Sequence, residues 1–230
     1  MGPASIAIRP PSNEAELRER ASWLEGRTIG ELAAAIGVGV PPAGARGKGK
    51  IGSLVEKALG AESGSLGVPD FPTLGIELKT IPIDGRGVPR ESTFVCTISL
   101  ADADRAEWET SALRAKLSCV LFVPVLSGSE ISSHERRIGA PLFWRPTPAQ
   151  EAVLHADFDD AMGIIGAGGI EAVTARAGRW LQVRPKAATG SVRTISFGPE
   201  GEWIATVPRG FYLRASFTRA LLEDPAALPV

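Results

Sequence analysis

The sequence is poor in the residues that build zinc sites and disulfide frameworks. Its 230 residues include only two cysteines, Cys96 and Cys119, and two histidines, His134 and His155. No CxxC spacing and no histidine cluster occurs, which excludes the usual zinc sites. Both cysteines have apolar neighbours in the sequence, so we expect buried, reduced thiols and a cytoplasmic protein.

Long apolar runs are also lacking. No segment approaches about 18 unbroken apolar residues, so we expect no membrane-spanning helix. The first residues, MGPASIAIRPPSNEAEL, show no basic region followed by an apolar core, so we expect no secretory signal. An apolar content of 44% and a charged content of 22% are ordinary for a globular protein of this length. The chain is long enough for one large domain or for two lobes.

The net charge of −1 conceals an uneven distribution of charge. Eight Lys or Arg residues lie between Arg176 and Arg219, where the only acids are Glu200 and Glu202. A second basic stretch, ARGKGKIG, covers residues 45–52. Such clusters fit a binding site for a polyanion as well as they fit a solvated surface.

Apolar periodicity and capping residues predict alternating helices and strands with no internal repeat. The first helix is expected to follow an N-cap at Ser12 or Asn13, and the second to run from Thr28 to Gly37, with a capping box formed by Thr28 and Glu31. A long helix is expected from Thr147, followed by Pro148 and Gln150, to about 163–166. The other expected helices lie over 51–61, 111–117 and 169–177 and after Ser216. Strands are expected over 76–81, 92–100, 119–125, 179–185 and 202–208, with a further segment at 209–217. This order predicts α/β structure in the first half and α+β structure in the second, in one chain with two lobes.

The stretch PDFPTLGIELKTI, Pro69–Ile81, places charged residues inside a predicted strand. Side chains alternate between the two faces of a strand, so Glu77 and Lys79 share one face. Asp70 can return to the same spot across the intervening turn, and Glu56 of the preceding helix can project towards it. Two carboxylates and an ammonium group suit a hard metal ion with a water molecule beside it. A half-exposed strand with solvated side chains is the alternative interpretation.

These residues resemble the PD-(D/E)xK nuclease motif, as Pro69-Asp70 followed by Glu77-Leu78-Lys79. Further blocks from about Glu14 to Leu222 resemble the MutH family of methyl-directed mismatch-repair endonucleases: TIGELAAAIG, GIELKTIPID, TFVC, WETS, RPKA and PRGFYL. The resemblance implies a restriction-endonuclease-like fold, with a mixed central sheet flanked by helices and two lobes around a DNA cleft. We assign a catalytic lobe to 13–107, a recognition lobe to 108–222 and a tail to 223–230.

The family resemblance implies hydrolysis of a phosphodiester with one or two Mg²⁺ ions. Asp70, Glu77 and a neighbouring main-chain carbonyl would hold the ion, and Lys79 would orient the attacking water. Glu56 would bind a second ion or a metal-bound water. Lys116 resembles a family lysine that touches the substrate phosphate, although by itself it would be an ordinary lysine on a helix surface.

The resemblance also implies recognition of double-stranded DNA at GATC. Methylation of adenine N6 is readable only in the major groove. Tyr212 resembles the tyrosine with which the family senses this mark, whereas without the resemblance it is one residue of an alternating strand. The residues expected to contact DNA are Lys48 and Phe94 on the catalytic side, and Arg184, Pro185, Lys186 and Tyr212 in the recognition lobe.

The activity implied is nicking of the unmethylated strand at hemimethylated GATC sites by a monomer. MutL would activate the enzyme, with MutS acting indirectly. The C-terminal sequence LLEDPAALPV departs from the family, because it has two prolines where we expect a longer helix. Two other functions stay open: a type II restriction endonuclease of the same fold that cuts GATC, and a DNA-binding module without catalysis.

Overall fold

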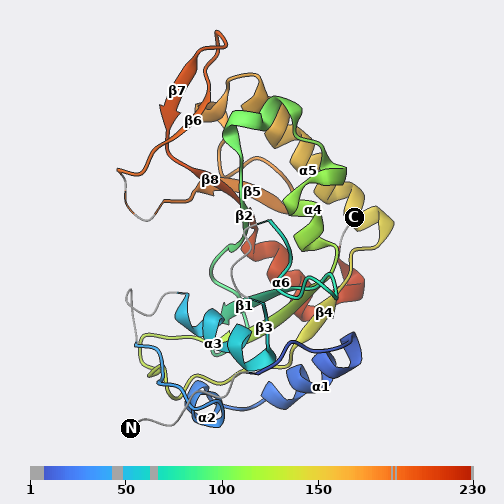
Figure 1. Cartoon of the computed structure of the whole chain (residues 1–230), viewed down its shortest axis with the longest axis vertical. Coiled ribbons are helices and arrows are strands. Elements are labelled where there is room, and N and C mark those ends of the chain that lie inside the picture. The colour runs from blue at the N-terminus through green and yellow to red at the C-terminus, as the bar shows by residue number, and fades with distance from the viewer. Residues whose placement is uncertain (1–7, 43–48, 63–66, 188, 190, 229–230) are drawn as a thin grey trace. The chain divides into compact units, whose positions relative to one another are not determined.

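The computed structural model describes residues 8–42, 49–62, 67–187, 189 and 191–228 (Figure 1). The chain divides into two compact units, Met1–Arg90 with Cys119–Trp144, and Glu91–Ser118 with Arg145–Val230. The units interleave in sequence, whereas the two expected lobes are contiguous. The assignment of catalysis and recognition to separate lobes stays a prediction.

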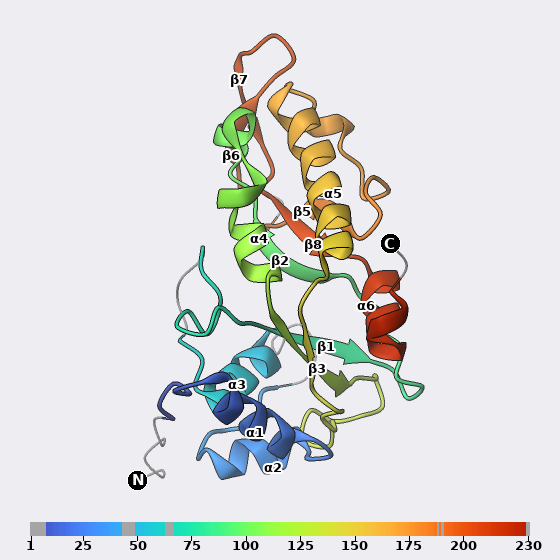
Figure 2. The same ribbon diagram turned by 90° about the vertical axis from the view of Figure 1, so that its right-hand side faces the viewer.

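The first unit packs three helices against a three-stranded sheet. Its elements are α1 (Glu14–Leu24), α2 (Ile29–Ala35), α3 (Lys50–Leu59), β1 (Glu77–Ile83), β3 (Val120–Leu126) and β4 (Leu142–Trp144). Strand β3 lies in the middle, parallel to β1 and antiparallel to β4. The three helices lie together on one side of this sheet (Figure 2), and their apolar faces form a buried core with β1 and β3. Strand β1 is therefore an edge strand with one covered face.

Helix starts in the first unit follow the capping residues in the sequence. The side chain of Asn13 accepts a hydrogen bond from the Glu16 N–H at 2.9 Å, which begins α1. Thr28 and Glu31 form the expected capping box at the start of α2. Each cap satisfies main-chain N–H groups that have no partner within the helix.

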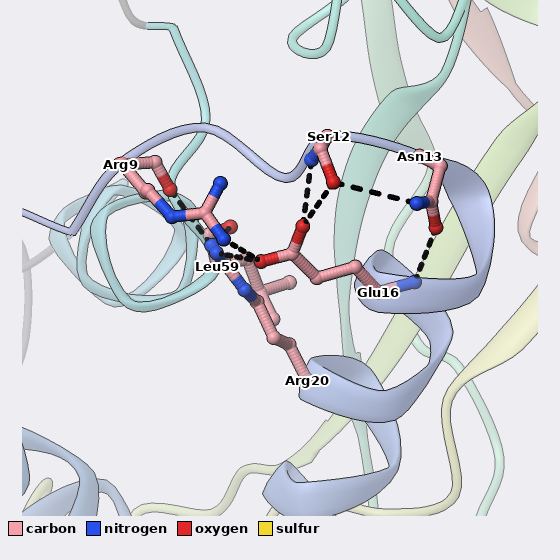
Figure 3. Close-up of polar contacts among 6 residues, drawn as sticks. All are labelled: Arg9, Ser12, Asn13, Glu16, Arg20 and Leu59. Atoms are coloured by element: carbon pink, nitrogen blue, oxygen red, sulfur yellow. Dashed lines mark hydrogen bonds and ion pairs between the residues drawn. The ribbon is translucent and has the colours of Figure 1, made fainter.

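The carboxylate of Glu16 ties the N-terminal segment to the end of α3 (Figure 3). It accepts hydrogen bonds from the main-chain N–H and the hydroxyl of Ser12, both at 2.7 Å, and from Arg20 at 2.6 Å. Arg20 also donates to the carbonyl oxygens of Arg9 at 2.8 Å and Leu59 at 3.0 Å. These bonds, led by the Ser12 N–H, lower the pKa of Glu16 from 4.5 to about 2. This group of hydrogen bonds around Glu16 and Arg20, called the Glu16 clasp below, holds Leu59, the last residue of α3. Helix α3 also carries Glu56, the predicted catalytic glutamate.

The second unit contains an antiparallel sheet, a separate hairpin and three helices. Its elements are β2 (Thr93–Thr97), α4 (Ala112–Leu117), α5 (Pro148–Gly166), β5 (Leu181–Pro185), β6 (Thr194–Phe197), β7 (Trp203–Thr206), β8 (Arg209–Leu213) and α6 (Ala215–Glu223). Strand β8 lies between β2 and β5, and β6 pairs with β7. Helix α5 lies across the sheet (Figure 2), with the rings of Phe158 and Phe211 5.7 Å apart. The mixed α+β fold class expected from the sequence is confirmed.

Several boundaries differ from the sequence-based predictions. The helix expected over 169–177 is wrong, because only a 3-10 turn forms, at Ile170–Ala172, in a segment that lies between Gly168 and Gly178, both of which have positive φ. Arg214, not Ser216, occupies the N-cap of α6. Strand β6 was not expected, since its residues lie in a stretch that reads as polar.

The expectations about the cysteines and about membrane-spanning helices can be compared with the structure. Cys96 and Cys119 are buried thiols that are not joined in a disulfide, as expected. Among the residues that the structure describes, no helix is both long enough and apolar enough to cross a membrane.

Candidate functional site

A tight turn brings Asp70 and Glu77 together. Phe71 and Ile76 form a two-residue bridge, with N–H···O distances of 2.9 and 3.3 Å, so the chain reverses between them. Gly75 has a φ of +63°, a conformation that favours glycine, and the buried ring of Phe71 anchors the turn in the core. Residues seven positions apart therefore become neighbours at the start of β1.

Asp70, Glu77 and Lys79 form one hydrogen-bonded group, as the sequence predicted. The main-chain N–H of Asp70 donates to Glu77 Oε2 at 3.2 Å, and Asp70 Oδ2 accepts from the Leu78 N–H at 2.9 Å. Lys79 Nζ donates to Glu77 Oε1 at 2.5 Å. The side chains of Glu77 and Lys79 are only 1% and 14% exposed. Low exposure strengthens the attraction between the two charges and makes the loss of either one costly.

The free edge of β1 directs a main-chain carbonyl to the same place. The N–H of Glu77 donates to the carbonyl of Cys119 beside β3 at 2.9 Å, so Glu77 uses its main chain on the β3 side. Main-chain groups of successive strand residues point to opposite sides. Leu78 therefore turns its N–H and C=O away from β3, and its N–H meets Asp70. Two carboxylates and the Leu78 carbonyl thus share this edge.

The oxygen atoms at this edge fit a hard divalent cation, because such ions take carboxylate and carbonyl ligands and keep several waters. Within the described ranges, no three His, Cys, Asp or Glu side chains come together as a metal-binding group. An ion bound by Asp70 and Glu77 would therefore take its other ligands from the main chain, water or substrate. The donor set suits an ion that shares its coordination with a phosphate.

Glu56 approaches β1 from helix α3. A Cβ atom placed on Gly52 would lie 3.8 Å from Glu56 Oε1 and 3.3 Å from Thr80 Oγ1, so both oxygens lie close to the same point. Thr80 alternates with Lys79 along β1 and belongs to the opposite face. Glu56 therefore lies near Thr80 of the strand, and its predicted role through a second ion or a bound water stays a prediction.

The structure describes one of the two lysines predicted to contact phosphate, Lys116, but not the other, Lys48. Lys116 lies in α4 of the second unit and is 6% exposed. Buried lysines are rare unless paired, so the alternative of an ordinary lysine on a helix surface is wrong. Lys48 lies outside the residues that the structure describes, and its predicted contact with phosphate stays a prediction.

In the second unit, two cationic side chains lie beside a pair of aromatic rings. Tyr212 of β8 lies opposite Phe94 of β2, with ring centroids 5.3 Å apart at 65°. Lys186 Nζ lies 4.2 Å from the Phe94 ring centroid, and Arg184 Cζ lies 5.6 Å from that of Tyr212. Such cation–π contacts hold the positive charges beside the rings. The structure thus brings together four of the six residues predicted to contact DNA.

A β-bulge in β2 explains why Phe94 joins this cluster. The pairing with β8 shifts between Phe94 and Cys96, so that Phe94 lies opposite Tyr212 and Cys96 opposite Phe211. The bulge directs Phe94 to the half-exposed face of the sheet, while Cys96 and Phe211 stay buried. The sequence placed Phe94 on the catalytic side, whereas the structure packs it with Tyr212 in the second unit.

Neighbouring groups fix the orientation and ionisation of the cluster. Arg184 Nη1 donates to Ser92 Oγ at 2.6 Å, a contact that the sequence did not suggest. The N–H of Lys186 donates to the carbonyl of Pro208 at 2.7 Å, just beyond the end of β5. Burial raises the pKa of Tyr212 above its usual value of 10, and the charge of Arg184 opposes this shift. The phenol is therefore neutral at physiological pH.

Comparisons with known proteins identify the family to which this chain is similar. A family model described as "DNA mismatch repair enzyme MutH" matches residues 59–157, which include the Asp70–Glu77–Lys79 group. The chain is 47% identical to the DNA mismatch repair protein MutH of Serratia proteamaculans (strain 568), with 93% of each chain covered. It is 46% identical to that of Escherichia coli (strain K12), with 94% of each covered. Against the protein of Salmonella newport (strain SL254) it is 47% identical, with 94% of this chain and 93% of the relative covered.

Proposed function

This chain belongs to the MutH family of DNA mismatch repair endonucleases, and from that premise we propose that it nicks the unmethylated strand of hemimethylated GATC sites. As a member it is a DNA hydrolase that depends on a divalent metal ion. We propose Mg²⁺ as that ion and MutL as the activating partner, with MutS acting through MutL. The observation that carries the cleavage proposal is the hydrogen-bonded group of Asp70, Glu77 and Lys79, of which Glu77 is buried and the other two are half-buried.

Asp70 and Glu77 would hold the divalent ion, with the Leu78 carbonyl at the same edge of β1. When bound, the ion supplies a Lewis acid for the phosphate and for the attacking water. Lys79, which donates a hydrogen bond to Glu77, would orient that water and offset negative charge on the phosphate oxygens. Attack of the water on phosphorus breaks one P–O bond of the backbone, which produces a nick rather than a double-strand cut by a single site.

The cluster of Phe94, Tyr212, Arg184 and Lys186 supports the proposal for recognition. Arg184 and Lys186 offer donors suited to guanine O6 and N7 or to phosphate. The ring of Tyr212 provides a rigid, uncharged surface that would crowd a methyl group on adenine N6. Lys116 and Lys48 would contact phosphates, which adds affinity that falls with salt rather than sequence preference.

We further propose that the protein acts as a monomer in the cytoplasm, where it meets chromosomal DNA. A monomer has a single Asp70–Glu77 group, which suits cleavage of one strand. The scarcity of cysteine and the two buried thiols agree with a reducing compartment.

The proposal is tested by incubating the protein and Mg²⁺ with plasmids that carry one GATC site in unmethylated, hemimethylated or fully methylated form. MutL is added to half of the reactions, and a plasmid with a scrambled site is the control. We expect nicks at GATC only, confined to unmethylated strands and increased by MutL. Sedimentation of the free protein tests the monomer.

The other two functions give different products in the same assay. A type II restriction endonuclease would cut both strands and would not respond to MutL. A DNA-binding module would retard the GATC plasmid without cutting it in any divalent metal. Either result would overturn the proposal.

A further inference from the structure

The buried carboxylate of Asp157 holds the start of strand β5, which carries Arg184. Asp157 lies in α5 and is 7% exposed. Its Oδ1 accepts a hydrogen bond from the Arg179 N–H at 2.6 Å, and its Oδ2 accepts from the N–H groups of Trp180 at 2.7 Å and Leu181 at 2.8 Å. Three successive main-chain N–H groups that converge in this way form an anion-binding nest. Here the anion is a side chain of the protein itself.

The loop before β5 is held from a second side. Gly178 has a φ of +81°, and a Cβ atom there would lie 2.5 Å from the Leu181 carbonyl and 3.3 Å from Asp157 Oδ1. A larger residue therefore does not fit between the loop and the carboxylate. Arg214, at the end of β8, donates to the carbonyls of Gly178 at 3.1 Å and Ala177 at 2.6 Å. The loop is thus fixed both to α5 and to β8.

These contacts determine which residues of β5 face the recognition cluster. Leu181 is buried, whereas Gln182 pairs with Tyr212 and, together with Arg184, lies on the more exposed face. Because side chains alternate in a strand, a slip of one residue would exchange the two faces. Val183 would then lie beside Tyr212, and Arg184 would point into the apolar core. Strand β5 is at the edge of its sheet, so the loop contacts add to a register that one neighbour alone would define.

We propose that Asp157 is a positioning residue for DNA recognition. By accepting three successive N–H groups, it sets the register of β5 and so keeps Arg184 beside Tyr212. The inference rests on the proposed function, since the position of Arg184 matters only if this cluster contacts the GATC site. Asp157 needs no contact with DNA for this role, and its acidic neighbours Asp159 and Asp160 are exposed.

The test compares Asp157→Asn with two control variants of the same helix. The amide nitrogen of asparagine is a donor, so at least one N–H of the nest loses its acceptor while the shape of the side chain is kept. Asp160→Asn makes the same change on an exposed side chain. Leu154→Ala opens a cavity in the core and lowers stability without touching the nest. All variants are assayed below their melting temperatures.

For Asp157→Asn we expect the preference for unmethylated over methylated GATC strands to fall about tenfold, because buried donors lose their acceptor and the strand loosens. KM should rise more than kcat falls, and main-chain amides of residues 179–182 should exchange hydrogen faster. Both controls should keep the wild-type preference. A general loss of stability would affect Leu154→Ala as well. A rise in KM and a loss of strand preference in Asp157→Asn alone therefore indicate a positioning role and not a merely structural one.

An unchanged preference in Asp157→Asn would overturn the inference, as would an equal loss in Leu154→Ala at a similar fall in Tm. If Asp157→Asn fails to fold, Arg214→Met replaces it, because methionine has no N–H to donate to the loop carbonyls of Ala177 and Gly178. The same loss of preference is expected, and its absence would also overturn the inference. A wild-type protein that shows no preference would instead refute the proposed function, and the inference would fall with it.

Discussion

The ion pair at the start of β1 predicts a measurable loss of stability when Lys79 is replaced. Lys79→Met removes the ammonium that lies 2.5 Å from Glu77 Oε1 and leaves a carboxylate that is 1% exposed. Removing one partner of a buried pair costs about 3–5 kcal/mol, and we expect about 3 kcal/mol because the Asp70 N–H still donates to Glu77. For a chain of this size, the Tm should fall by about 6–12 °C.

The same variant connects stability to metal binding. A divalent ion held by Asp70 and Glu77 replaces the missing positive charge, so the difference from wild type should shrink as Mg²⁺ is added. Thermal unfolding is followed by circular dichroism with and without Mg²⁺. Lys50→Met removes an exposed lysine of α3 and should change stability by less than about 0.5 kcal/mol. A loss no larger than that of Lys50→Met, or one that Mg²⁺ leaves unchanged, would refute the reasoning.

Three further outcomes are expected. Glu77→Ala should abolish nicking but leave DNA binding in gel shifts largely intact, whereas the exposed control Glu62→Ala should keep both nicking and binding. Equal loss of nicking and binding in Glu77→Ala would remove Glu77 as a metal ligand. Tyr212→Ala should reduce discrimination between methylated and unmethylated GATC more than it slows cutting. Tyr212→Phe should keep this discrimination, because the ring and not the neutral hydroxyl is expected to contact the methyl group. Unchanged discrimination in Tyr212→Ala would exclude the residue from the site. The pKa of Glu16 is lowered from 4.5 to about 2, so its contribution to stability is present above pH 4.5 and is lost as the pH falls towards 2. Glu16→Gln should therefore flatten this part of the curve of stability against pH, and an unaltered acid limb would contradict the Glu16 clasp.

The parts of the fold that depend on local signals could be predicted from the sequence. Thr28 and Thr147 begin α2 and α5 as expected, because a capping box is formed by residues three positions apart. The alternation of Glu77 and Lys79 likewise placed both on one face of a strand. By contrast, the helix expected over 169–177 does not form beyond a 3-10 turn. Its end belongs to the loop before β5, where the carbonyls of Ala177 and Gly178 accept hydrogen bonds from the distant Arg214.

The parts of the site that depend on contacts between distant segments could not be predicted from the sequence. Phe94 joins Tyr212 only through a bulge and the pairing of β2 with β8, which lie more than a hundred residues apart in the sequence. The burial of Lys116 depends on how its helix packs, and no local pattern signals this. Ser92 accepts one hydrogen bond from Arg184 and Asp157 accepts three from residues 179–181, and these partners lie far along the chain, so no local pattern singles out either residue.

The interleaving of the two units limits how the protein can be divided by genetic means. The chain passes from one unit to the other after residues 90, 118 and 144. A fragment that ends near residue 107 would contain β1 without β3 and β2 without β8, so both sheets would lack their central strand. Neither unit can therefore be exchanged with a homologue as a single continuous cassette. Chimaeras that exchange one whole unit between homologues need three coordinated crossover points, and recombination at a single point should yield unfolded products.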